Sequence, residues 1–95
     1  MKNITLRGQL LNINDNTIFF NILKPLKNTF SINDKIYEFL TKGYIAQVTI
    51  LTQKVILTKD TPFIKKEEVK SKFIGASPWY RYWYKIKDLG QQELF

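Results

Sequence analysis

The sequence contains no cysteine and no histidine. These absences exclude disulfides, zinc sites built from Cys and His, a thiol nucleophile and an imidazole general base. A chain without cysteine suits a reducing compartment, and Lys2 and Arg7 interrupt any signal-peptide core at the N-terminus. Apolar runs are too short to span a bilayer. We therefore expect a cytoplasmic protein that does not contact membranes.

Acidic residues and glycines are scarce as well, with eight Asp and Glu and four Gly among 95 residues. Glu67 and Glu68 are adjacent in a lysine-rich stretch, which is typical of a solvated surface. The glycines are scattered, so no phosphate-binding loop is present. We expect neither catalytic residues nor a metal or other cofactor, and predict that the protein is not an enzyme.

Positive charge is abundant by comparison. The formal net charge is +7 and the sequence pI is about 9.7. Such a balance favours a polyanionic partner, and lysine, which supplies most of it, suits phosphate as a point charge. The alternative is that the lysines serve only solubility.

Residues 1–59 read mainly as β-strands. Alternating apolar residues in 3–13 and 17–23, joined by turn residues 14–16, predict a hairpin, with a bulge near Gly8. Residues 28–41 fit either a helix capped by Ser31 or a strand, and we favour the strand. Residues 42–50 and 54–58 are β-rich. The run 30–37 resembles the start of small SH3-like barrels. We predict a small OB-like or SH3-like five-stranded barrel over 1–59.

Residues 60–90 form a basic, aromatic segment that we expect to be helical. Residues 66–74 read as a short helix, and Ser77-Pro78 followed by Gly90 predicts a second helix over 78–89. The predicted fold is therefore mainly β with C-terminal α, in which a small β-barrel precedes one or two short helices. Residues 1–90 would make one domain, followed by a tail at 91–95.

Cations and aromatic rings interleave within this segment, as in surfaces that bind single-stranded nucleic acid. Helical spacing of Trp79, Trp83 and Ile86 predicts that both tryptophans dock on the barrel. The remaining side chains would then form the binding surface. The predicted nucleic-acid-binding residues are Tyr80, Arg81, Tyr84, Lys85, Lys87, Lys65, Lys66, Lys70 and Lys72.

Part of the same segment resembles the helix–turn–helix of excisionase and transposase DNA-binding domains. The resemblance covers about twenty residues and implies a duplex-binding protein. It rests on the runs Glu67-Glu68-Val69, Phe73-Ile74-Gly75-Ala76-Ser77-Pro78 and Tyr82-Trp83-Tyr84-Lys85.

The last five residues, Gln-Gln-Glu-Leu-Phe, resemble the peptide with which bacterial replication and repair proteins bind the sliding clamp. Gln91, Leu94 and Phe95 match its anchoring positions, while Gln92 stands where that family most often has Leu. The resemblance implies that Leu94 and Phe95 enter an apolar pocket on the clamp and that Gln91 hydrogen-bonds at its rim. The alternative is that both apolar residues fold back onto the core.

Together these features resemble small single-stranded DNA-binding proteins of phages and mobile elements. We expect a non-enzymatic DNA replication accessory protein that binds single-stranded DNA and docks on the sliding clamp or a polymerase. Two alternatives are a phage-encoded inhibitor of a host clamp or defence nuclease, and a helix–turn–helix protein that binds duplex DNA.

Overall fold

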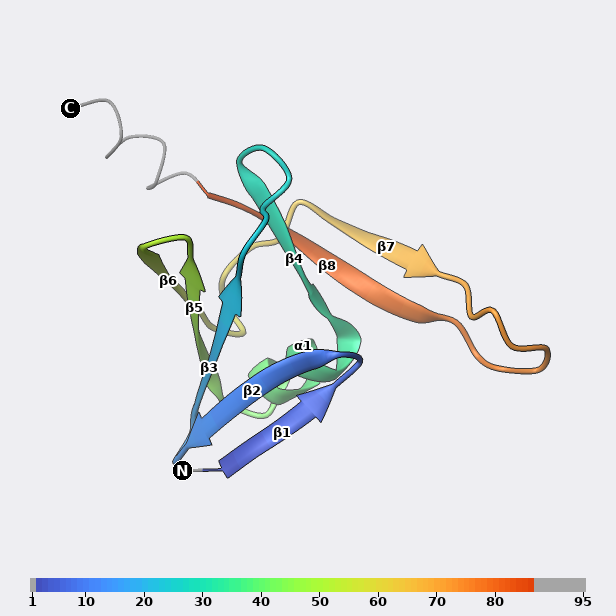
Figure 1. The fold of residues 1–95 in the computed structure, drawn as a ribbon, viewed down its shortest axis with the longest axis horizontal. Helices are drawn as coiled ribbons and strands as arrows, with labels where there is room; N and C mark the ends of the chain where they lie inside the picture. The colour runs from blue at the N-terminus through green and yellow to red at the C-terminus, as the bar shows by residue number, and fades with distance from the viewer. Residues whose placement is uncertain (1, 87–95) are drawn as a thin grey trace.

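The computed structural model describes residues 2–86, which form eight strands in two sheets and one helix (Figure 1). The elements, in chain order, are β1 Lys2–Leu6, β2 Gln9–Asn14, β3 Thr17–Ile22, β4 Thr29–Asn33, α1 Asp34–Thr41, β5 Ile45–Ile50, β6 Gln53–Leu57, β7 Lys65–Val69 and β8 Trp79–Lys85. The prediction of a mainly β protein is confirmed. No helix in the described part of the chain is long and apolar enough to cross a membrane.

Five strands form the first sheet, in the order β1-β2-β3-β5-β6. Turn residues 14–16 do join two antiparallel strands, as predicted. Residues 3–13, predicted as one bulged strand, instead form β1 and β2. Arg7 and Gly8 both have positive φ, 47° and 81°, which is the tight hairpin turn that matches strand twist.

Residues 28–41 contain both of the structures between which the sequence left a choice. β4 is a strand, and α1 begins directly after it. The cap is Asn33 rather than Ser31, because the Asn33 side-chain oxygen accepts a hydrogen bond from the Ile36 N–H at 2.9 Å. Gly43, with φ of 102°, follows the end of the helix.

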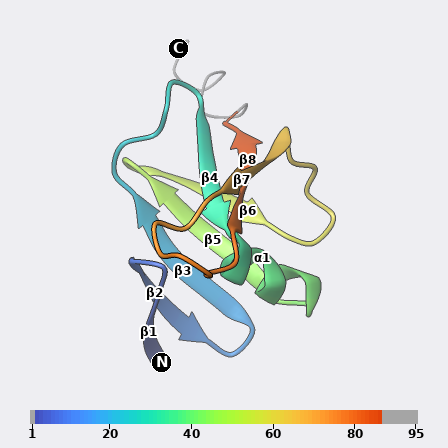
Figure 2. The ribbon, with the colours of Figure 1, turned by 90° about the vertical axis from the view of Figure 1, so that its right-hand side faces the viewer.

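The predicted five-stranded barrel over 1–59 is corrected to two sheets. β4 does not join the first sheet. It pairs with β8 instead, which gives a second sheet in the order β4-β8-β7. β3 and β5 then lie parallel, and the connection between them runs through β4 and α1. The buried core contains residues from both sheets and from α1, among them Ile18, Phe30, Leu40, Val48 and Tyr84. Figure 2, viewed from the side of β7 and β8, shows the strands of the two sheets running in different directions.

The predicted C-terminal helices are wrong over the residues described. Residues 66–74 form most of β7 and the start of a loop, and residues 79–85 form β8. Trp and Tyr are strong strand formers, and Pro78 can precede a strand as well as open a helix. β7 and β8 make an antiparallel arm that projects from the body (Figure 1), and the molecule measures 50 × 30 × 24 Å.

Tyr84 is the largest fully buried side chain among the described residues, and it lies opposite Phe30 within the second sheet. It is 1% exposed, its ring stacks on Phe30 with centroids 5.7 Å apart, and its buried hydroxyl has no hydrogen-bond partner among residues 2–86. Burial, and secondarily the phenols of Tyr37 and Tyr82, raises the pKa of Tyr84 above its ordinary value. The hydroxyl therefore stays neutral and costs stability, while the ring supplies packing.

Replacing Tyr84 separates these two effects. We expect Tyr84→Phe to leave the free energy of unfolding unchanged or to raise it by about 1 kcal/mol, because an unsatisfied buried hydroxyl is removed. Tyr84→Ala should lower it by roughly 3–5 kcal/mol through the cavity it leaves. Urea denaturation measures both. A clear loss of stability in Tyr84→Phe would mean that the hydroxyl has a partner.

Candidate functional site

The side chains of β8 alternate between the two faces of the second sheet. Tyr82, Tyr84 and Ile86 point inward and are buried. Trp79, Arg81 and Trp83 point outward and are partly exposed. The sequence prediction is thus inverted, because the tryptophans lie on the outer face and the tyrosines, Tyr84 above all, face the core.

Strand pairing extends this outer face sideways. Trp79, Arg81 and Trp83 lie opposite Val69, Glu67 and Lys65 of β7. Arg7, in the β1–β2 turn, reaches the same face and places its guanidinium carbon 4.8 Å from the centre of the Trp79 ring. We call the set of Arg7, Lys65, Glu67, Trp79, Arg81, Trp83 and Lys85 the platform.

Each indole ring of the platform has at least one cation within contact distance. The Arg81 guanidinium carbon lies 5.2 Å from the centre of Trp79, and the Lys65 Nζ lies 5.6 Å from the centre of Trp83. These distances are those of cation–π contacts. Lys85, two residues after Trp83 and on the same face of β8, is exposed. The platform therefore presents two aromatic rings among four positively charged side chains.

Glu67 is the one carboxylate of the platform and orients it. Its Oε1 accepts a hydrogen bond from the Trp83 indole N–H at 2.9 Å and lies 3.6 Å from an Arg81 Nη. The hydrogen bond from Trp83, with the charges of Arg81 and Lys65, lowers the pKa of Glu67 below its ordinary value. Glu67 thus fixes the Trp83 ring and offsets part of the local positive charge.

Asp34, at the start of α1, ties the platform to the body. Its Oδ1 accepts a hydrogen bond from Arg7 Nε at 2.9 Å, and its Oδ2 accepts one from the Tyr80 backbone N–H at 3.4 Å. One carboxylate therefore joins the β1–β2 turn, the helix and the first residues of β8. This contact holds Arg7 beside Trp79.

The other predicted binding residues are separated by the fold. Tyr80 packs against the core, and Lys66 lies on its side of the arm, with its Nζ 4.4 Å from the centre of the Tyr80 ring. Lys70 and Lys72 are exposed in the loop between β7 and β8. Lys87, Gln91, Leu94 and Phe95 lie outside the described residues. Of the predicted set, Lys65, Arg81 and Lys85 belong to the platform.

Four platform residues escaped the sequence prediction, and one of them, Glu67, was expected only to lie on a solvated surface. Arg7 is far from the arm in sequence, and nothing local indicates its contact with Trp79. Trp79 and Trp83 were placed in the core by their helical spacing. A period-two pattern, with Tyr80, Tyr82, Tyr84 and Ile86 alternating with the tryptophans and Arg81, was the available signal for the correct assignment.

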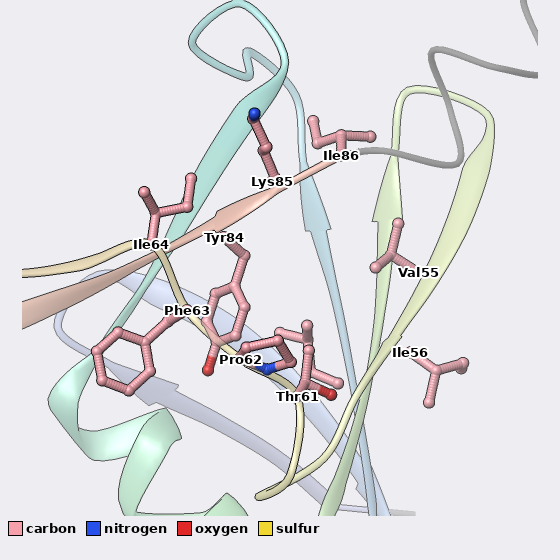
Figure 3. A pocket seen from close by; sticks show the side chains of 10 residues that line it. Val55, Ile56, Thr61, Pro62, Phe63, Ile64, Tyr84, Lys85 and Ile86 are labelled. Carbon is pink, nitrogen blue, oxygen red and sulfur yellow. The ribbon is translucent and has the colours of Figure 1, made fainter.

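A separate apolar pocket of about 480 Å³ lies between β6, the loop before β7 and the end of β8 (Figure 3). Its lining includes Val55, Pro62, Phe63 and Ile86, with Lys85 at one side. A pocket with this mainly apolar lining is suited to bind an apolar group rather than a phosphate. Within residues 2–86, no three Asp or Glu side chains gather where they could hold a metal ion.

No protein-family model, no curated protein and no solved structure matches the chain.

The charge of Glu67 gives a test of the platform's geometry. A carboxylate whose pKa is lowered by folding stabilises the protein above its ordinary pKa of about 4.5, and this stabilisation is lost as the pH falls. Glu67→Gln keeps an oxygen acceptor for Trp83 but removes the charge. We expect the stability difference between wild type and Glu67→Gln to be constant above pH 4.5 and to shrink below it, as measured by denaturation across pH. A difference that does not change with pH would contradict the Arg81 and Trp83 contacts.

Proposed function

We propose that this protein is a non-enzymatic, single-stranded DNA-binding accessory factor in replication, and that the platform is its DNA-binding surface. The observation that carries the proposal is the placement of Trp79 and Trp83 on one outward face of β8, with Arg81 between them and Lys65 beside them. Single strands are bound by such a combination, in which bases stack on aromatic rings and cations follow the phosphates.

Stacking of a base on Trp79 is energetically favoured over the cation–π contacts that this ring makes with Arg7 and Arg81. A cation–π contact at an exposed site contributes about 0.5–1 kcal/mol, whereas stacking of a base contributes about 1–3 kcal/mol. A base can therefore displace Arg7 or Arg81 from the Trp79 ring. The displaced guanidinium then remains next to the ligand, where it can pair with a phosphate.

The shape of the arm supports a single strand over a duplex. The helix–turn–helix resemblance requires two helices over 67–85, and those residues form β7, a loop and β8. The part of the chain that carries the cations and rings thus offers no helix to the major groove. Unpaired bases, by contrast, can reach partly exposed rings on the outer face of a sheet.

Docking on the sliding clamp, or on a partner polymerase, is the second part of the proposal. It rests on the resemblance of Gln91, Leu94 and Phe95 to the clamp-binding peptide, since these residues lie outside those described. The chain leaves β8 at Lys85, at the opposite end of the strand from the loop of residues 70–78. A replication role in a phage or mobile element would unite the two binding activities.

Both tryptophans of the chain belong to the platform, so tryptophan fluorescence, excited selectively, reports on this surface alone. We expect an oligothymidine ligand to quench it. Trp79→Leu and Trp83→Leu should each weaken binding about 5- to 150-fold, because a stacked base is lost while apolar cover of the sheet is kept. Fluorescence anisotropy of a labelled oligonucleotide measures the affinity.

A matched pair of lysines provides the control. Lys65 lies on the platform, whereas Lys54 is exposed on β6 in the other sheet. Lys65→Ala should reduce the slope of log affinity against log salt by about 0.7, and Lys54→Ala should leave it unchanged. Unaltered affinity in both tryptophan variants, or tighter binding to duplex than to single strands, would refute the platform.

Leu94→Ala combined with Phe95→Ala tests the tail. We expect this double variant to lose binding to a bacterial sliding clamp, because two apolar anchors are removed, and to keep its affinity for single-stranded DNA. Surface plasmon resonance with immobilised clamp measures the first and anisotropy the second. Equal loss of both would mean that the tail is structural, and clamp binding by a protein that does not bind DNA would indicate an inhibitor.

A further inference from the structure

The end of the arm carries an exposed apolar pair. Phe73 is 80% exposed and Ile74 is 105% exposed, more than any other large apolar residue described. They lie in the loop of residues 70–78 that joins β7 to β8, at the far end of the arm from the body (Figure 1). We call Phe73 and Ile74 the tip.

The backbone holds the tip outward. The Ala76 N–H donates to the Phe73 carbonyl at 3.2 Å, and Gly75 has a φ of 84°, the pattern of a β-turn with Phe73 at its first position and Ile74 at its second. The Ser71 hydroxyl oxygen accepts a hydrogen bond from the Phe73 N–H at 3.2 Å. The two apolar side chains therefore project from an ordered turn.

The surroundings of the tip indicate what it contacts. Lys70 and Lys72 are exposed on the approach to it, and the cationic platform lies on the same arm. Trp79 and Ile74 are five residues apart, so they lie within roughly 18 Å of each other. A polyanion on the platform would thus continue past the lysines to the tip.

We propose that the tip is a wedge that covers the last base pair of a duplex at the point where it opens into the single strand bound by the platform. The proposal rests on the proposed function. Apolar side chains on minor-groove proteins insert between base steps, which requires the steps to unstack. At a junction the end pair already exposes one face, so Phe73 and Ile74 can cover it without that cost.

A protein with both the platform and the wedge is suited to one particular DNA structure, the junction between duplex and single strand. A single strand alone would engage the platform and leave the tip in water. A junction engages both, and the two lysines beside the tip face the phosphates of the duplex end. The protein should therefore accumulate at forks and primer ends rather than along uniform single strands.

Four labelled DNA substrates test the wedge: a single strand, a blunt duplex, and two junctions in which a duplex continues into the same single strand with one or the other polarity of overhang. We expect wild type to bind one junction about 5- to 20-fold more tightly than the single strand. Phe73→Ala combined with Ile74→Ala should abolish this preference while leaving single-strand affinity unchanged. The fluorescence of 2-aminopurine at the last base pair should change when wild type binds the junction. It should not change when the double variant binds.

Trp79→Leu is the matched control. It should weaken binding to the single strand and to the junction by the same factor, so failure of the platform is distinguishable from failure of the wedge. Single-strand binding without any junction preference in wild type overturns the wedge and leaves the platform standing. Sedimentation with anionic lipid vesicles that depends on Phe73 and Ile74, without junction preference, would overturn it in favour of a membrane contact.

Discussion

The two-residue alternation of β8 determines how the molecule is built. Its inward side chains complete the core: Tyr84 stacks on Phe30, and Tyr82 stacks on Tyr37 with ring centroids 3.8 Å apart. A strand has only two faces, so burying these tyrosines commits Trp79, Arg81 and Trp83 to the other side. The same packing that stabilises the fold therefore creates the surface for which we propose a function.

The sequence predicted the β-rich class and the turn at residues 14–16, because turn residues and alternation are local signals. The prediction failed where the spacing of two residues fits both the helical and the strand period. Trp79 and Trp83 are four residues apart, which places them on one face of a helix and equally on one face of a strand. Ile86, seven residues after Trp79, fits only the helix, and together with Ser77-Pro78 and Gly90 it favoured the wrong structure.

The barrel prediction failed for a different reason. Alternation identifies a strand but not its neighbour, and nothing within residues 29–33 indicates that β4 pairs with β8, some fifty residues later. The candidate site was likewise only partly predictable. Lys65, Arg81 and Lys85 were found by charge, whereas Arg7 enters through a contact between distant segments that only the folded chain brings together.

Arg7 connects the first hairpin, β1–β2, to the outer face of the arm. Its guanidinium contacts Trp79 while its Nε donates to Asp34, so the β1–β2 turn, α1 and β8 share one set of contacts. A ligand that contacts Arg7 binds only the state in which this hairpin is packed against the arm. Binding therefore stabilises that state and makes local opening of the hairpin rarer. Occupancy at one end of the molecule is thereby linked to amide protection in strands that never touch the ligand.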